Sequence, residues 1–163
     1  MRKIYLYTEP DGGVPFLRFL AVTDEKMRQK LRHGLYCLAR FPDYMTEPHV
    51  KHFNIERYKD LYEFRERIRI LVRIIFTLDA AGNVIILHPF VKKHDCNTMQ
   101  ALESSLRMLH QINNAQGGLT EYQWKEDANA AKTNESNHGG RGGAGCHSRN
   151  CFALNFEEMR EKK

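Results

Sequence analysis

The sequence predicts an α+β domain: an N-terminal strand and helices packed on a small antiparallel sheet, and then a C-terminal helix. Hydrophobic periodicity indicates the order strand, helices, run of strands, helix. The short polar turns between the strands favour an antiparallel meander. The composition changes near residue 112, and seven of the eleven glycines lie beyond that point. We therefore expect a folded domain over residues 1–112 and a low-complexity, mostly disordered tail over 113–163.

The N-terminal third of the domain reads as one strand and two helices. Residues 3–8 alternate apolar and polar side chains, which predicts a strand. Residues 14–20 read as a short helix, and Thr23 is the expected N-cap of a longer one that ends near Arg40. The longer helix is predicted from apolar residues at helical spacing, namely Met27, Leu31, Leu35 and Leu38.

Three strands and one helix are expected in the remainder of the domain. Segments 60–65, 68–77 and 84–88 are rich in apolar and β-branched residues, which is typical of strands. Asn97 or Thr98 can cap the final helix. Its predicted apolar stripe consists of Met99, Leu102, Leu106 and Leu109.

Alternation along the 68–77 strand separates an apolar face from a cationic one. The face expected to bury beneath the helices carries Ile68, Ile70, Val72, Ile74 and Phe76. The opposite face carries Arg73 and Arg69. If neighbouring strands pair in antiparallel fashion, Arg65, Lys93 and His88 join this open face. Arginine suits a phosphate ligand because its planar fork donates two parallel hydrogen bonds.

Charge and cysteine content limit the class of protein. Residues 1–112 hold 18 Lys and Arg against 13 Asp and Glu, so they carry the whole net charge of +5 and leave the tail neutral. A basic domain is compatible with a polyanionic partner. Four scattered cysteines and no apolar stretch of signal or membrane-span length predict a cytoplasmic protein without a disulfide framework. We expect no metal and no cofactor, because His49/His52 and Cys146/His147/Cys151 lack a complete ligand set.

Four strings in this order resemble the RelE/ParE superfamily of bacterial toxins, and most closely its HigB-like, phage-derived branch. They are Leu61-Tyr-Glu-Phe-Arg65, Leu71-Val-Arg-Ile-Ile-Phe76, Val84-Ile-Ile-Leu-His88 and Phe90-Val-Lys-Lys93. The resemblance implies the toxin of a type II toxin–antitoxin pair, with a helix-turn-helix antitoxin as partner. It also implies ribosome-dependent, metal-free cleavage of mRNA, with the ribosome and mRNA as further partners and no membrane association.

The resemblance assigns catalytic roles to Arg65, Arg73 and Lys93 by motif position. His94 joins them by its chemistry, since histidine exchanges protons near neutral pH. The expected RNA contacts are Lys51, Arg69, Lys92 and His88. Some relatives have a lysine where this chain has Glu63, so we expect that contact to be missing. The position that aligns with a family tyrosine holds Met99, for which His94 and His110 are the nearest substitutes.

Two alternative functions remain open at this point. The same fold serves ParE-like proteins, which inhibit DNA gyrase by binding and without catalysis. The long tail and Met99 also allow an inactive relative of the nucleases. The concentrated cationic face favours the endoribonuclease.

Overall fold

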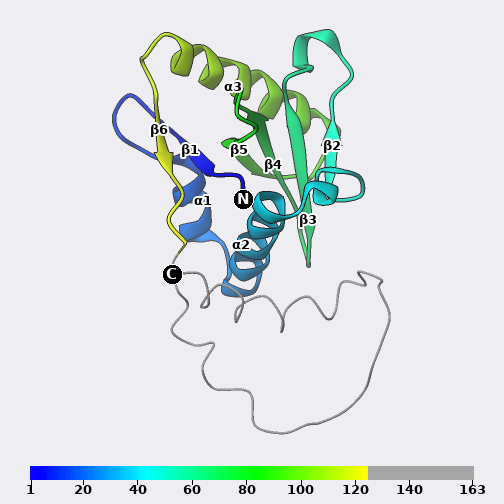
Figure 1. Cartoon of the computed structure of the whole chain (residues 1–163). Coiled ribbons are helices and arrows are strands. Elements are labelled where there is room, and N and C mark those ends of the chain that lie inside the picture. Colours follow the sequence, from blue (N-terminus) through cyan, green and yellow to red (C-terminus); the bar gives the residue numbers. More distant parts are fainter. Residues whose placement is uncertain (125–163) are drawn as a thin grey trace, which may run out of the picture. The chain divides into compact units, whose positions relative to one another are not determined.

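The computed structural model describes residues 1–124, which form a six-stranded sheet with helices on both faces (Figure 1). The strands are β1 (Ile4–Thr8), β2 (Val50–His52), β3 (Tyr62–Arg67), β4 (Leu71–Leu78), β5 (Val84–Val91) and β6 (Gly118–Glu121). The helices are α1 (Pro15–Val22), α2 (Glu25–Arg40) and α3 (Asp95–Asn113), with short 3-10 turns η1 (Pro42–Met45) and η2 (Glu56–Tyr58). The predicted α+β fold class is confirmed.

The sheet has the strand order β2-β3-β4-β5-β1-β6. β3, β4 and β5 pair antiparallel as the expected three-stranded meander, and β2, which lies in a segment read as a polar connection, adds a further antiparallel strand beside β3. β1 lies parallel to β5. The sheet is therefore mixed and not purely antiparallel. The two helices between β1 and β2 carry the chain back to the end of the sheet at which β1 finishes, and three antiparallel steps then leave β5 parallel to β1.

The helices cover opposite faces of the sheet, whereas we expected them on one face. Gly34 of α2 lies directly over the ring of Phe64 on β3. α3 packs on the other face, against Ile75 of β4 and its neighbours. The cluster beneath α3 consists of Tyr7, Phe53, Tyr58, Leu61, Ile75, Ile85, Leu87, Ala101 and Leu102. The cationic face is consequently partly covered by α3 and is not an open surface.

The start of β4 and the cap of α2 differ from the predictions. β4 begins at Leu71, and residues 68–70 form the turn from β3. Ile70 is therefore 43% exposed instead of buried. Asp24, not Thr23, caps α2 by accepting a hydrogen bond from the backbone N–H of Met27 at 3.0 Å.

The fold continues past residue 112, where we expected it to end. β6 follows α3 and pairs antiparallel with β1 over four residue pairs, from Tyr5–Glu121 to Thr8–Gly118 (Figure 1). The expected disordered tail from residue 125 onward, including Cys146 and Cys151, lies outside the described residues. None of the helices described is both long and apolar enough to cross a bilayer.

Candidate functional site

Two of the predicted catalytic residues lie directly opposite each other in the centre of the sheet. Arg65 of β3 and Arg73 of β4 are cross-strand partners, and Arg73 also lies opposite Phe90 of β5. Alternation places both guanidinium groups on the same face as Ile75, which is the face that carries α3. Arg65 retains 27% of its side-chain surface and Arg73 retains 14%.

A buried carboxylate joins the two arginines. Glu63, on the same face of β3, is 3% exposed. Its Oε1 accepts a hydrogen bond from Nε of Arg65 at 2.9 Å and lies 3.5 Å from Nε of Arg73, which is an ion pair without a hydrogen bond. Two like charges placed directly opposite in a sheet repel each other. The Glu63 carboxylate offsets that repulsion and leaves a net charge of one on the three side chains.

Burial and neighbouring charges act on the Arg73 guanidinium. Burial lowers the pKa of Arg73, and the nearby cation of Arg65 acts in the same direction, while Glu63 opposes both. A guanidinium nevertheless remains protonated in proteins. Its Nη1 donates hydrogen bonds to the backbone carbonyls of Val72 at 3.1 Å and Glu66 at 3.5 Å. Arg73 is thus a fixed, partly desolvated cation, whose field on a nearby anion is stronger than that of a cation in water.

The link between β5 and α3 brings further cations to the same end of the sheet. The backbone N–H of Lys92 donates to the carbonyl of Leu71 at 2.8 Å, which fixes this link beside the start of β4. Lys92 also pairs with Asp95 at 3.1 Å. The backbone N–H groups of Lys93 and His94 both donate to the side chain of Asn97, at 3.1 and 2.9 Å.

Lys93 and His94 are both exposed, and His94 is the N-cap residue of α3. Within residues 1–124, Lys93 forms no ion pair with a carboxylate. Phe90, the cross-strand partner of Arg73, lies three residues before Lys93. Lys93 and His94, both among the predicted catalytic residues, therefore lie in the segment that follows β5, the strand that pairs with Arg73.

The four expected RNA contacts divide between this face and other places. Lys51 of β2 lies opposite Glu63, so it extends the face by one strand, and its Nζ lies 5.7 Å from the centre of the Phe53 ring. Lys92 lies in the β5–α3 link described above. Arg69 is exposed in the β3–β4 turn, so its predicted place on a strand face is wrong, because β4 begins two residues later.

His88 is on the predicted face but is not a cation. It lies opposite Ile75, and its Nδ1 is buried without a hydrogen-bond partner among the described residues. Burial lowers the pKa of His88, and the positive charge of Arg107 on α3 lowers it further. The neutral imidazole offers no charge to a phosphate at pH 7.

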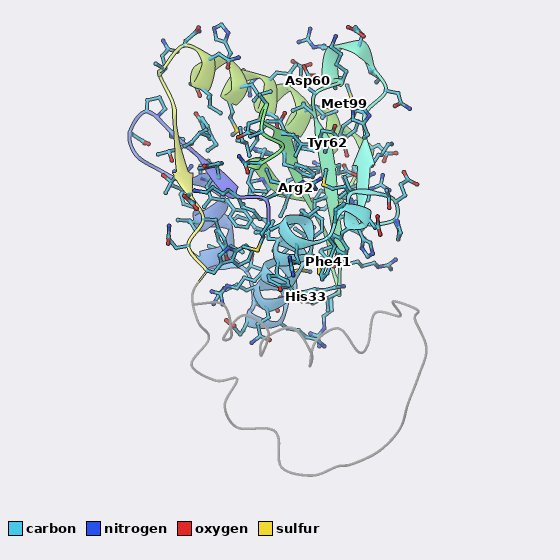
Figure 2. All side chains as sticks on the ribbon, in the orientation of Figure 1. Arg2, His33, Phe41, Asp60, Tyr62 and Met99 are labelled. Carbon is cyan, nitrogen blue, oxygen red and sulfur yellow. The ribbon has the colours of Figure 1, made fainter. Side chains whose placement is uncertain are left out.

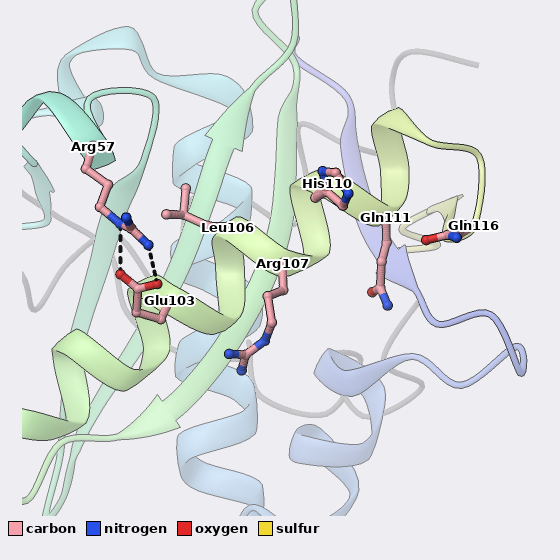
Figure 3. A pocket seen from close by; sticks show the side chains of 7 residues that line it. All are labelled: Arg57, Glu103, Leu106, Arg107, His110, Gln111 and Gln116. Atoms are coloured by element: carbon pink, nitrogen blue, oxygen red, sulfur yellow. Dashed lines mark hydrogen bonds and ion pairs between the residues drawn. The ribbon is translucent and has the colours of Figure 1, made fainter.

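The two substitutes for the family tyrosine lie at opposite ends of α3. Sixteen residues separate His94 from His110, which corresponds to about 24 Å along a helix. His110 lines a shallow groove together with Arg107 and Gln111 (Figure 3), and the arginine pair is not among the residues that line it. A bidentate ion pair between Arg57 and Glu103, at 3.0 and 2.7 Å, borders the same groove (Figure 3).

Met99, at the tyrosine position, lies in the second turn of α3 and is 48% exposed (Figure 2). Of the two histidines, only His94 lies close in the chain to Phe90, the residue of β5 that pairs with Arg73. Residues 1–124 hold no group of three His, Cys, Asp or Glu side chains suited to a metal ion.

Sequence reasoning missed Glu63 as a member of this cluster. From the sequence, Glu63 was interpreted only as a residue that replaces the lysine of some relatives, with the loss of that lysine's contact. The alternation Glu63-Phe64-Arg65 does place the carboxylate on the face of Arg65. Its burial, however, depends on α3 and on the neighbouring strands, which the local pattern does not specify.

Comparison with known proteins identifies one matching family. The family model described as phage-derived protein Gp49-like (DUF891) matches residues 18–121, which is more than half of the chain. The match includes all the strands of the meander and the whole Glu63–Arg65–Arg73 cluster. A search of curated proteins found no match.

Proposed function

The chain belongs to the phage-derived Gp49-like family, and we propose that it is the toxin of a toxin–antitoxin pair that cleaves mRNA on the ribosome. The family is associated with RelE-like and toxin-like proteins, which supports an antitoxin as the partner. The observation that carries the proposal is the direct pairing of Arg65 with Arg73 on one face of the sheet. The sequence motifs of the HigB-like branch provide the further support.

The proposed reaction uses the RNA's own 2′-hydroxyl as nucleophile. The 2′-oxygen attacks the adjacent phosphorus and the bond to the 5′-oxygen breaks, leaving a 2′,3′-cyclic phosphate and a 5′-hydroxyl. Negative charge accumulates on the phosphate oxygens in the transition state, where fixed cations stabilise it most effectively. Arg65 and Arg73 supply that stabilisation.

Two proton transfers complete the reaction. We assign them to Lys93 and His94, which are exposed in the link that follows β5. An imidazole suits either transfer near neutral pH. Lys51, Lys92 and the exposed Arg69 hold the RNA backbone, since lysine and arginine contacts to phosphates position a nucleic acid without reading its sequence.

Inducible expression tests the proposed function. We expect the wild-type chain to arrest growth and to produce new 5′ ends on a reporter mRNA, detected by primer extension. Arg73→Ala should lower the rate of cleavage by about 100-fold or more, as expected for the loss of one transition-state donor. Arg18→Ala is the matched control, because Arg18 on α1 is also ion-paired, to Glu9, but lies outside the cluster.

Two outcomes would contradict the nuclease. Full toxicity of the double variant Arg73→Ala, Lys93→Ala would show that the cationic cluster is not needed. Growth arrest with DNA-damage signalling and intact mRNA would instead favour the gyrase inhibitor. Arg73→Ala and the double variant should first be shown to fold by circular dichroism, so that a loss of toxicity cannot be a loss of structure.

A further inference from the structure

The position of Glu63 has a consequence for both arginines at once. A single oxygen, Oε1, lies against Nε of Arg65 and Nε of Arg73. The carboxylate is buried, so water competes little for it and its attraction for the two cations is strong. A carboxylate is costly to bury unless it is paired and hydrogen-bonded. Here the pairing is made with two residues that the proposed reaction requires.

Anchoring through Nε determines how each guanidinium is oriented. The group is planar, so a contact at Nε leaves the Nη atoms to donate elsewhere. In Arg73, Nη1 is held by two backbone carbonyls, which leaves Nη2. In Arg65, neither Nη atom forms a hydrogen bond within residues 1–124, and Glu47, at 3.8 Å from Nη1, is the exposed end of a weak ion pair.

One available Nη group on each of two adjacent arginines is what a phosphate requires, because each guanidinium can donate to a phosphate oxygen. Without the carboxylate, the repulsion between the two opposed cations would no longer be offset at their Nε atoms. From these contacts we infer that Glu63 is a positioning residue, which holds Arg65 and Arg73 side by side with their Nη groups presented to the scissile phosphate. The inference rests on the proposed function and names the residue that organises its site.

The structure also provides a matched control. Glu66 lies on the same strand and is likewise buried, at 8% exposure, but its side chain faces α2 and pairs with Lys30 at 2.9 Å. Its carboxylate lies on the opposite face of the sheet from the arginine pair. Glu66→Gln therefore removes another buried charge from β3 without touching either guanidinium Nε.

The first measurement reports on the arginines and needs no activity. In the full-length protein, Nε–H signals of Arg65 and Arg73 can be followed by ¹⁵N nuclear magnetic resonance. Glu63→Gln keeps the volume of the side chain and removes its charge. We expect it to shift both signals and speed their exchange with water, while Glu66→Gln, whose carboxylate contacts neither Nε, changes them much less. Unchanged Nε–H signals in folded Glu63→Gln would overturn the inference.

The second measurement is cleavage of mRNA on programmed ribosomes. We expect Glu63→Gln to lower kcat by about 100-fold, the effect of a misplaced reacting group, with little change in KM. Glu63→Asp keeps the charge but retracts it, so it should lose less activity than Glu63→Gln, and it serves if the latter fails to fold. A kcat equal to that of the wild type in either variant would overturn the inference.

The two measurements separate failure of this inference from failure of the proposed function. If the wild-type chain cleaves no mRNA, the nuclease is wrong, and the Nε–H signals alone support or overturn the anchoring by Glu63. If the wild type cleaves and Glu63→Gln cleaves equally well, the nuclease stands and the positioning role is wrong.

Discussion

At the scale of single residues, the cationic cluster is organised by a carboxylate. Arg65 and Arg73 occupy directly opposed positions, an arrangement that is unfavourable for like charges. Glu63 lies within ion-pair distance of both and is almost fully buried. The carboxylate therefore offsets the repulsion within the arginine pair, and under the proposed function a fixed pair would need less reorganisation to bind a phosphate.

Two half-buried histidines predict an acid-sensitive fold. Burial lowers the pKa of His88 and of His33, the latter against the opposing charge of Glu66. The unfolded chain, with ordinary histidines near pKa 6.5, takes up protons first as the pH falls. The contribution of these two neutral histidines to the free energy of unfolding is thus present above about pH 6.5 and is lost progressively below it.

We expect a lower free energy of unfolding at pH 5.5 than at pH 7.5, measured by urea denaturation. Glu103, whose pKa is lowered by hydrogen bonds from Arg57 and Tyr58, stays ionised across this window and contributes no slope. His88→Leu should reduce the difference between the two pH values, whereas His110→Leu, at an exposed site, should preserve it. An identical pH dependence in wild type and His88→Leu would contradict this account.

At the scale of elements, α2 can approach the sheet closely only because position 34 lacks a side chain. A Cβ atom built at Gly34 would lie 2.3 Å from Cζ of Phe64, which is fully buried on β3. The glycine, which weakens a helix interior, is therefore retained for packing. The close contact holds β3, and with it Glu63 and Arg65, at a fixed distance from α2.

Gly34→Ala is expected to destabilise the fold despite the better helix propensity of alanine. Propensity favours the variant by about 1 kcal/mol, but overpacking a dense core costs about 1–3 kcal/mol. The net loss should appear as a lower urea midpoint, and Phe64→Leu should rescue it in the double variant. Gly118→Ala, where the new Cβ would lie 3.6 Å from Thr8, is the control and should change the midpoint little. A more stable Gly34→Ala variant would refute the packing argument.

At the scale of the whole described domain, a strand that follows the last helix covers the edge of the sheet beside β1. β6 pairs with β1, and the backbone N–H of Tyr122 donates to the carbonyl of Ile4 at 2.8 Å. The buried ring of Tyr122 meets Phe16 of α1 edge-on, with centroids 6.3 Å apart. Without these residues β1 would become an edge strand with unpaired backbone groups.

Truncation distinguishes this arrangement from a domain that ends at residue 112. A chain of residues 1–112 should be less stable than one of 1–123 by about 3 kcal/mol or more, the typical cost of losing a buried aromatic side chain. Urea denaturation of the two chains measures the difference. Equal midpoints would mean that β6 adds nothing to the fold.

The elements themselves could be predicted from the sequence, because their signals are local. Periodicity placed β1, both N-terminal helices, the three-stranded meander and α3 near their observed bounds. The same alternation put Arg65 and Arg73 on one face. β6 was missed, since its four exposed residues show no apolar pattern and only pairing with β1 makes them a strand. Arg69 was misplaced because the turn before β4 continues the apolar pattern of the strand.

The surroundings of the site were decided by tertiary structure. An irregularity in the β4–β5 pairing matches Ile75 with His88 and Phe76 with Ile86, so the intervening Leu87 also reaches the cluster beneath α3. Packing of α3 on the face with the arginines made that face half-buried. Periodicity is a property of neighbouring residues and determined which side chains share a face. Burial, pairing of charges and the environment of Glu63 arise from contacts between segments far apart in the chain, which only the folded molecule specifies.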